Sequence, residues 1–286
     1  MAKNRTTHAA FGKFPLIINR QPSQGSIDLH SHAFTELVVI LGGNAVHYSR
    51  ADSYDIMAGD CFVVERAHGY KESNKLSLVN ILFIPEQLPV PWNEARKLPG
   101  YHAFFALEPQ YRKLHNFRSR LRLEPSGLAH VSELIDTIEQ ELHKKNAGYE
   151  IMATGLFMQL ISFISRAYSR MQGTEYADLM GLSEVISHIE RNFADEIRMA
   201  DLAAMAAMSE SRLLRAFRRA TGHAPIDYLI HLRIRQACGL LRQKESTITA
   251  IAYQTGFNDS NYFTRQFRRI MGMSPRQFRK GRRLSS

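Results

Sequence analysis

The chain carries one pattern twice, as LAAMAAMSESRLLRAFRRATGHAP at residues 202–225 and as IAYQTGFNDSNYFTRQFRRIMGMSP at residues 251–275. From Arg215 and Arg265 onward the two copies match at an offset of 50. Before the turn they match at an offset of 49, so the second copy has one extra residue there. Each copy predicts a short helix, a sharp turn and an arginine-rich helix. An internal repeat is a strong architectural signal, and two tandem helix-turn-helix units would present two such helices to one face of DNA.

The net charge of +10 is concentrated on the half of the chain that holds the repeat. Residues 183–286 contain 18 Lys and Arg against 9 Asp and Glu, whereas residues 1–182 contain 19 against 18. A basic surplus placed in this way is typical of a module that neutralises DNA phosphates. A membrane-surface role is disfavoured, because the basic residues alternate with core residues of compact helices. At 286 residues the chain has room for two domains with separate cores.

Cysteine usage and hydropathy point to a reducing compartment. The two cysteines, Cys61 and Cys238, lie in apolar surroundings in different halves, which predicts buried free thiols. The basic start at Met1–Arg5 is followed by polar residues, and no run approaches the ~18 apolar residues of a membrane span. We therefore expect a cytoplasmic protein without a signal peptide or a membrane partner.

The changing hydrophobic period predicts an α+β fold in four parts. Between residues 14 and 84, short apolar runs separated by glycine-containing turns indicate a small β-barrel or sandwich. A proline-rich, irregular stretch follows at residues 85–99. The expected parts are a barrel at 1–125, a helical hairpin at 126–170, a polar linker at 171–182 and an all-α domain with two helix-turn-helix units at 183–286.

The helical hairpin is predicted from apolar residues at i, i+3, i+4 and i+7 spacing. Its first helix begins near Gly127 and its second near Tyr149, with a loop at residues 144–148 between them. The expected buried residues are Leu128, Val131, Leu134, Ile135, Ile138 and Leu142 in the first helix, and Ile151, Leu156, Leu160 and Ile164 in the second.

In the first helix-turn-helix copy, the arginine-rich helix has one face for packing and another for DNA. Ser209 is a good N-cap, and Leu213 and Phe217, four residues apart, supply the buried stripe. The residues expected on the DNA-facing side are Ser211, Arg212, Leu214 and Arg215.

In the second copy, Asn258 or Asp259 is the expected cap, and Phe263 and Phe267 anchor the helix. The residues expected to face DNA are Ser260, Asn261 and Arg265, with Tyr262 at the edge.

These side chains suit the major groove. Arg can bridge guanine O6 and N7, Asn can bridge adenine N6 and N7, and Leu can contact a thymine methyl group. Other arginines are expected to contact phosphates and to set affinity without sequence choice; they are Arg218, Arg219, Arg268, Arg269, Arg276, Arg279, Arg282 and Arg283. The alternative is that each arginine only solubilises a helix face.

The doubled unit resembles the DNA-binding domain of AraC/XylS-type bacterial transcription regulators. The resemblance spans about residues 183–284 and rests on Thr221-Gly222, Ile251-Ala252, Gly256-Phe257, Phe263, Phe267, Gly272 and Ser274-Pro275. Within that class, Asn258-Asp259-Ser260-Asn261-Tyr262-Phe263 is similar to the rhamnose-operon activators, as are Asn192-Phe193-Ala194-Asp195-Glu196, Asn80-Ile81-Leu82 and Phe157-Met158-Gln159-Leu160. The resemblance thus extends, more thinly, over most of the chain.

The resemblance implies specific residue roles. The positions of Ser211, Leu214 and Arg215, and those of Asp259, Asn261 and Arg265, would contact bases in two successive major grooves. Rhamnose activators have arginine where this chain has Ser211, so the operator sequence expected for this chain differs from theirs. Many class members have an acidic residue where this chain has Ala250, so the resemblance does not imply a contact with RNA polymerase through this position.

The N-terminal part contains a histidine motif. His30-Ser31-His32 is followed by Glu36, and His68 lies further along the chain. This run resembles the first motif of cupins, which implies a cupin-like jelly-roll barrel. Three interpretations stay open for His30, His32, Glu36 and His68: polar groups that bind a small hydroxylated effector, a divalent metal site, or histidines without a role. Arg50 is placed with the effector-binding residues, and Tyr48, Tyr70 and Trp92 are further pocket candidates.

Together these features predict a regulator rather than an enzyme, without a cofactor or a metal. We expect a ligand-responsive transcription regulator, and the resemblance implies an activator of carbohydrate catabolic genes with L-rhamnose as the first candidate effector. Its expected partners are double-stranded DNA, a sugar, RNA polymerase and a second copy of the chain, with the hairpin helices carrying dimerisation or only packing on the barrel. The alternatives are a metal-dependent cupin enzyme tethered to DNA, and a repressor that needs no ligand.

Overall fold

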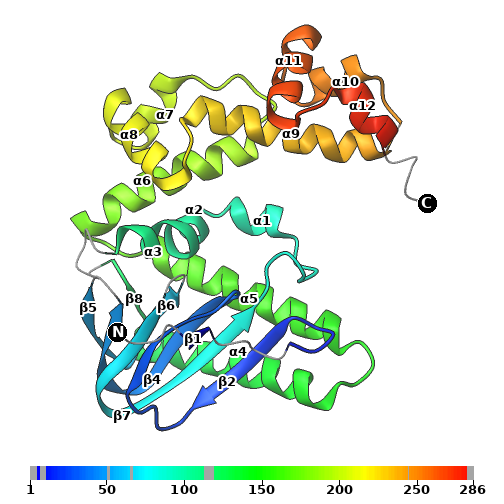
Figure 1. Cartoon of the computed structure of the whole chain (residues 1–286). Coiled ribbons are helices and arrows are strands. Elements are labelled where there is room, and N and C mark those ends of the chain that lie inside the picture. The colour runs from blue at the N-terminus through cyan, green and yellow to red at the C-terminus, as the bar shows by residue number, and fades with distance from the viewer. Residues whose placement is uncertain are drawn as a thin grey trace. The chain divides into compact units, whose positions relative to one another are not determined.

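The computed structural model describes residues 5–6, 11–49, 52–64, 67–112, 119–243 and 245–281. The chain forms two compact units, Met1–Ser183 and Glu184–Ser286, and each is described by itself (Figure 1). The first unit combines a mostly antiparallel β-sheet with helices, and the second is entirely helical in its described residues. The α+β class and the helical C-terminal half are therefore as predicted.

Two long strands form the centre of the N-terminal sheet. β4 (Thr35–Ser49) pairs antiparallel with β7 (His68–Phe83), from Thr35 opposite Phe83 to Ser49 opposite His68. The sheet has the order β1-β3-β7-β4-β6-β8, with β2 on β7 and β5 on β4. The remaining strands are β1 (Arg5–Thr6), β2 (Leu16–Gln21), β3 (Ile27–Ser31), β5 (Ser53–Met57), β6 (Asp60–Val64) and β8 (Leu121–Arg122).

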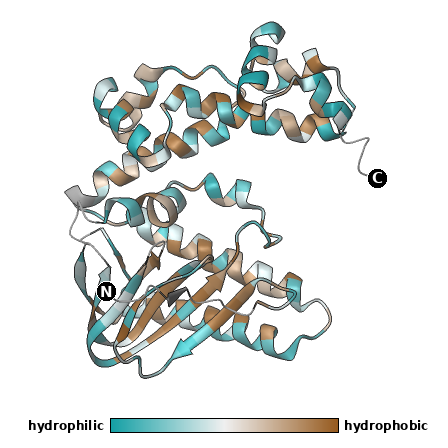
Figure 2. Ribbon diagram, viewed as in Figure 1, coloured by the Kyte–Doolittle hydropathy of each residue, from teal (hydrophilic) through white to brown (hydrophobic). Residues whose placement is uncertain are grey.

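Successive side chains of a strand point to opposite faces of the sheet. Because the central strands carry apolar residues at successive positions, both faces of the sheet are apolar. In β4, Leu37 and Val39 belong to one core cluster, shared with the helices, while Val38 and Ile40 belong to a second cluster on the opposite face. The short apolar runs predicted as strands between residues 14 and 84 lie in the sheet, and Figure 2 shows much of it as brown, hydrophobic ribbon. A sheet that is buried on both faces can hold a polar group away from bulk water.

The proline-rich stretch at residues 85–99, expected to be irregular, contains the short helix α1 (Trp92–Arg96) and the first residue of α2 (Pro99–Tyr101). The π-helical η1 (His102–Leu107) and α3 (Glu108–Tyr111) follow directly. Glu108 is fully buried, and its carboxylate accepts a 2.7 Å hydrogen bond from Arg112. Arg112 also donates to the Val63 carbonyl on β6 at 2.8 Å. This buried ion pair fixes the segment on the sheet.

The two hairpin helices form as predicted and pack on the sheet. They are α4 (Pro125–Lys144) and α5 (Tyr149–Ser169). Leu160 and Ile164 are buried as expected, but Ile151 is 80% exposed, so the expectation for that residue is wrong. The buried stripe of α5 is Ala153, Phe157, Leu160, Ile161, Ile164, Ser165 and Tyr168. Ile151 lies two residues before the first of these, which places it on the opposite side of the helix.

Helix α5 is long and apolar enough to cross a membrane by length and composition alone. Its buried stripe packs into the core cluster that also contains Val39 and Ile81 of the sheet. Cys61 and Cys238, the two cysteines, are both buried and free, as predicted.

Residues 171–182, expected to be an irregular linker, are helical from Thr174 onward. They form the start of α6 (Thr174–Arg191), and the boundary between the two units falls inside this helix. Tyr176, Leu179 and Leu182 are buried at three-residue intervals. The helical period was not recognised in the sequence because the further apolar residues Met171, Ala177 and Met180 do not follow this spacing and two glycines interrupt the segment.

The C-terminal unit contains the repeat as two similar helix pairs. The first pair is α7 (Met199–Met205) and α8 (Glu210–Thr221), and the second is α10 (Ile248–Gln254) and α11 (Ser260–Met271). The long helix α9 (Pro225–Gln243) connects them, and α12 (Pro275–Lys280) follows the second pair. Figure 2 shows alternating teal and brown turns on these helices, as amphipathic helices require.

Candidate functional site

Helix α8 is fixed at both ends and along one face. The Ser209 side chain caps it by accepting a hydrogen bond from the Arg212 backbone nitrogen at 3.3 Å, and Gly222 ends it with a φ of 77°. Leu213 and Phe217 are fully buried. Ser211, Arg212 and Arg215 are exposed on the remaining surface.

Helix α11 is also held by a side-chain cap, a C-terminal glycine and a buried face. The Asp259 side chain caps it by accepting from the Asn261 backbone nitrogen at 2.7 Å, and Gly272 ends it with a φ of 71°. Phe263 and Phe267 are fully buried. Of the two caps that the sequence left open, Asp259 is therefore the one used.

The turn before each of these helices also repeats. Ala207 has a φ of 50° and Gly256 a φ of 85°, at the offset of 49 seen in the sequence. The next residue, Met208 or Phe257, donates its backbone N–H to the Ala203 or Ala252 carbonyl at 2.9 or 3.0 Å. A Cβ on Gly256 would lie 2.6 Å from the Ala194 carbonyl oxygen, so only glycine fits the second turn without movement.

The exposed faces of the two helices match residue by residue. Residues 211–220 and 261–270 have the same order of exposed, half-buried and buried positions. The exposed members include Arg212, Arg215, Arg218, Asn261, Arg265 and Arg268, whereas Leu214 and Ser260 are half-buried. The Arg265 guanidinium lies 5.8 Å from the centre of the exposed Tyr262 ring, a cation–π contact that orients it. The structure thus gathers the predicted DNA-facing residues on one face of each helix.

Some basic residues bind other parts of the same unit. Arg269 pairs with Asp227 at 2.9 Å, and Arg279 donates to the Ser246 carbonyl at 2.8 Å. Arg233 on α9 donates to the Phe193 and Asp195 carbonyls at 2.6 and 2.7 Å. These contacts give Arg233, which the sequence did not single out, a structural role. Arg282 and Arg283 lie outside the described residues.

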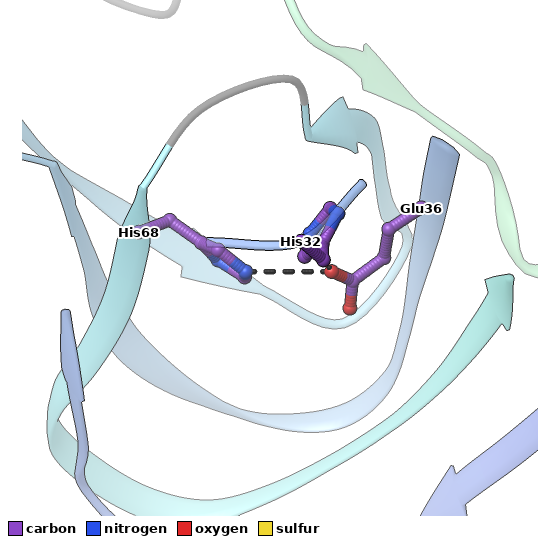
Figure 3. Close-up of side chains that lie close together, drawn as sticks. All are labelled: His32, Glu36 and His68. Carbon is purple, nitrogen blue, oxygen red and sulfur yellow. Dashed lines mark ion pairs between the residues drawn. The ribbon is translucent and has the colours of Figure 1, made fainter. Parts of the chain in front are cut away.

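In the N-terminal unit, three of the four histidine-motif residues converge on one carboxylate oxygen. The Glu36 Oε2 atom lies 2.7 Å from His32 Nε2 and 3.3 Å from His68 Nε2 (Figure 3). The side chains of His32, Glu36 and His68 are almost fully buried, at 3%, 4% and 2% exposure, while His30 is half-buried. His30 stands beside them, with its ring centre 4.5 Å from that of His68. The three converging side chains are therefore shielded from bulk water.

The electrostatics of this group follow from burial and pairing. Burial would raise the pKa of Glu36, but the hydrogen bonds and charges of His32 and His68 hold it at about 2. Burial opposes the charge on His32, yet its hydrogen bond to Glu36 raises the pKa of His32 above its usual value. Burial lowers the pKa of His68 despite Glu36. At neutral pH the group thus holds a carboxylate next to imidazoles of different basicity.

Two further polar residues complete the group: Tyr70, a pocket candidate from the sequence, and His47, which the sequence analysis did not single out. His47 Nε2 lies 3.3 Å from His68 Nδ1, and the Tyr70 ring centre lies 5.6 Å from that of His68. The buried Tyr70 hydroxyl has no hydrogen-bond partner among the described residues. An unpaired buried hydroxyl costs roughly 1–3 kcal/mol, so a ligand that bonds to it would gain that stabilisation.

The other pocket candidates lie elsewhere or cannot be placed. Trp92 donates to the Pro85 carbonyl at 2.7 Å and stacks on Phe83 in the core shared with the helices. Tyr48 donates to the Ile27 carbonyl at 3.1 Å. Arg50 lies outside the described residues.

A separate cavity of about 200 Å³ opens between β2 and the α4–α5 loop. Phe14, Glu139, His143, Lys145 and Tyr149 contribute to its lining, and none of the motif histidines does. Among the described residues, this cavity is thus separate from the histidine group.

Comparison with known proteins identifies the C-terminal repeat. The helix-turn-helix domain family model matches residues 202–281. HTH-type transcriptional activator RhaS of Escherichia fergusonii is 34% identical over 266 residues, which cover 91% of this chain and 90% of that protein. HTH-type transcriptional activator RhaR of Mannheimia succiniciproducens is 28% identical over 267 residues, covering 93% and 91%. The DNA-binding domain of AdpA, solved with a target DNA, is 34% identical, covers 36% of this chain and 93% of that domain, and has a TM-score of 0.34.

The chain is a DNA-binding transcription regulator of the helix-turn-helix class. Because RhaS is 34% identical over nine-tenths of both chains, the protein belongs to the AraC/XylS-type family of transcriptional activators. This confirms the resemblance seen in the sequence.

Proposed function

We propose that the protein activates carbohydrate catabolic genes when a small hydroxylated effector binds to its N-terminal unit. The observation that carries this proposal is the buried histidine group, in which an ionised carboxylate, several imidazoles and the unpaired Tyr70 hydroxyl lie together. Sugar sites place a few fixed polar groups in an otherwise apolar wall. The resemblance to the rhamnose-operon activators makes L-rhamnose the first sugar to test, and the fold that we propose for the sheet is a cupin-like jelly roll.

Thermal unfolding with a panel of monosaccharides tests the effector. A ligand at 100 times its Kd should add ~2.7 kcal/mol to the stability of the state that binds it. We expect L-rhamnose or a related sugar to raise the melting temperature, and His68→Ala to remove the shift. Tyr149→Ala, in the separate cavity, is the matched control and should keep it. No shift with any sugar contradicts the proposal, and loss of the shift only in Tyr149→Ala moves the site to the cavity.

For DNA recognition, we propose that the exposed faces of α8 and α11 enter two successive major grooves. The matched exposure of Arg215 and Arg265 supports this, because equivalent cationic side chains are presented by both copies. Footprinting of the chromosomal promoter region, with and without sugar, should show two protected segments that strengthen when the effector is present. A ligand changes activity only through its different affinity for two states, so an identical footprint contradicts the regulatory step.

We further propose a cytoplasmic homodimer that contacts RNA polymerase. The exposed Ile151 and Met152, at 80% and 55%, support a dimer face on α5, since large apolar side chains are seldom left in water together. Light scattering of wild type and Ile151→Glu tests this: we expect a dimer that dissociates in the variant, and a monomeric wild type contradicts it.

The second candidate function is a metal-dependent enzyme, favoured by one observation. Donor atoms of His32, Glu36 and His68 all lie within 4.8 Å of one another, and two imidazoles with one carboxylate are a common set for divalent ions. Elemental analysis of the purified protein separates the two candidates. A stoichiometric metal that is lost in His32→Ala favours the enzyme, and its absence together with a sugar-dependent shift favours the regulator alone.

A further inference from the structure

A second group of two histidines and one carboxylate lies in the C-terminal unit, away from the exposed faces of α8 and α11. His223 stands just before α9, Asp227 lies in the first turn of α9, and His231 lies one turn later. Asp227 and His231, four residues apart on α9, lie on one face of the helix, and His223 in the preceding turn lies beside Asp227. All three residues are half-buried, so the group is accessible to a small ion from water.

The three donor atoms converge on one point. Asp227 Oδ2 lies 3.2 Å from His223 Nδ1 and 3.8 Å from His231 Nε2. The two imidazole rings face each other with their centres 4.5 Å apart, and one donor atom from each of the three residues lies within 4.8 Å of the others. An ion with bonds of ~2.0–2.1 Å to each ligand needs donors roughly 3–3.5 Å apart. The 3.2 Å between Asp227 and His223 already lies in this range, and the 3.8 Å between Asp227 and His231 lies just above it.

The carboxylate of this group is already oriented from its other side. Arg269, at the end of α11, donates to Asp227 Oδ1 at 2.9 Å, while Oδ2 faces the histidines. A ligating carboxylate whose second oxygen is held by a hydrogen bond is typical of built metal sites. His223 is held in place by its backbone N–H, which donates to the Thr221 hydroxyl at 3.2 Å.

We propose that His223, Asp227 and His231 form a binding site for a divalent transition-metal ion, with Zn²⁺ as the reference ion. Two imidazoles with one carboxylate favour Zn²⁺, Co²⁺ or Ni²⁺ over Mg²⁺ and Ca²⁺, which prefer sets made of oxygen ligands. The bound ion joins the segment after α8 to α9. Through Asp227 and Arg269 it also joins α9 to α11, so it stiffens the connection between the two helix-turn-helix copies.

Titration of the full-length, tag-free protein with Zn²⁺ tests the proposal, and Co²⁺ absorption reports the ligand set. We expect His223→Ala and His231→Ala each to weaken Zn²⁺ binding at least about tenfold, since loss of a mere supporting residue already costs about 10–100-fold. Arg269→Ala should weaken it by about tenfold while leaving the Co²⁺ spectrum of the saturated protein unchanged. The exposed His143→Ala, outside both histidine groups, is the control and should bind as the wild type does.

His32, Glu36 and His68 in the N-terminal unit can also offer donor atoms to Zn²⁺ or Co²⁺. The titration is therefore repeated in the His68→Ala background. The proposal requires that one Zn²⁺ site survives His68→Ala and disappears when His231→Ala is added. It also requires that Zn²⁺ raises the melting temperature of the His68→Ala protein but not that of the double variant. Absence of Zn²⁺ binding in the His68→Ala protein, or binding unaffected by His223→Ala and His231→Ala, overturns it.

Discussion

In the first helix-turn-helix copy, α8 buries Leu213 and Phe217, and in the second copy α11 buries Phe263 and Phe267 at the same positions. Both helices start at a side-chain cap and end at a glycine with positive φ. Their exposed residues differ, however: Ser211 and Arg212 in the first copy correspond to Asn261 and Tyr262 in the second. The repeat therefore keeps the scaffold of a DNA-contacting helix and varies its surface. Two copies with one scaffold and different surfaces can recognise two different base sequences.

The largest expected effect tests whether the two interiors are equivalent. Phe217→Ala and Phe267→Ala should each cost ~3–5 kcal/mol of stability, because each removes a fully buried ring and leaves a cavity. Phe217 packs on Tyr228, and Phe267 packs on Phe263 and Phe278. Chemical unfolding followed by circular dichroism measures both losses, and the exposed Arg218→Ala is the control. A loss below 1 kcal/mol in one copy alone would show that its core is not a true equivalent of the other.

The next effect concerns the turn, where the copies differ in residue type but share positive φ. Gly256→Ala should cost ~1–2 kcal/mol from the left-handed backbone alone, and more because the new Cβ would lie 2.6 Å from the Ala194 carbonyl oxygen. The reverse change, Ala207→Gly, relieves a similar strain but frees the unfolded chain by ~0.4–1 kcal/mol, so it should change stability by less than about 1 kcal/mol. Melting temperatures of the two variants give the comparison. If Ala207→Gly lowers the melting temperature as much as Gly256→Ala does, the two turns do not share the same left-handed backbone strain and are not equivalent.

Much of this architecture could be predicted because its signals are local. The repeat, the caps and the i, i+4 phenylalanines each depend on a few neighbouring residues, and the structure has them as expected. The two hairpin helices were also visible from their period, although Ile151 shows that a single apolar residue in the first turn does not define a face.

The N-terminal polar group was harder to predict, because β-strand parity is lost at bulges. In β4, even-numbered Glu36, Val38 and Ile40 point to the face that carries the histidine group. Register shifts between Ile40 and Val46 reverse the alternation, so that odd-numbered Ala45 and His47 share this face. A prediction that assumes strict two-residue alternation along β4 therefore places the His47 side chain on the face opposite to the histidine group. Contacts such as Arg233 to the Phe193 carbonyl, 40 residues apart, leave no local sequence signal at all.

Base recognition is where the two surfaces should differ. Arg215→Ala and Asn261→Ala should each reduce operator affinity by ~1–3 kcal/mol and relax the preference at particular base pairs. The affected base pairs should lie in different half-sites for the two variants, because each copy presents its own exposed face. Fluorescence anisotropy with single-base variants of the footprinted operator measures this. If both variants relax the same base pairs, or lose affinity for every sequence alike, the assignment of one groove to each copy is wrong.

The smallest effect concerns residues that the two copies share. Arg218 and Arg268 are exposed at equivalent positions in the last turns of α8 and α11. As phosphate contacts they should each contribute about 0.9 to the slope of log affinity against log salt concentration, without sequence preference. Arg218→Ala and Arg268→Ala should therefore lower the slope by the same amount, and the double variant by twice that amount. Asn261→Ala is the control and should leave the slope unchanged, because a base contact releases no counterion. The contradicting outcome is a salt slope that Arg218→Ala reduces and Arg268→Ala leaves unchanged. In that case α11 is held on DNA by its base contacts alone. The shared scaffold of α8 and α11 would then not imply that the two helices dock on DNA with the same geometry.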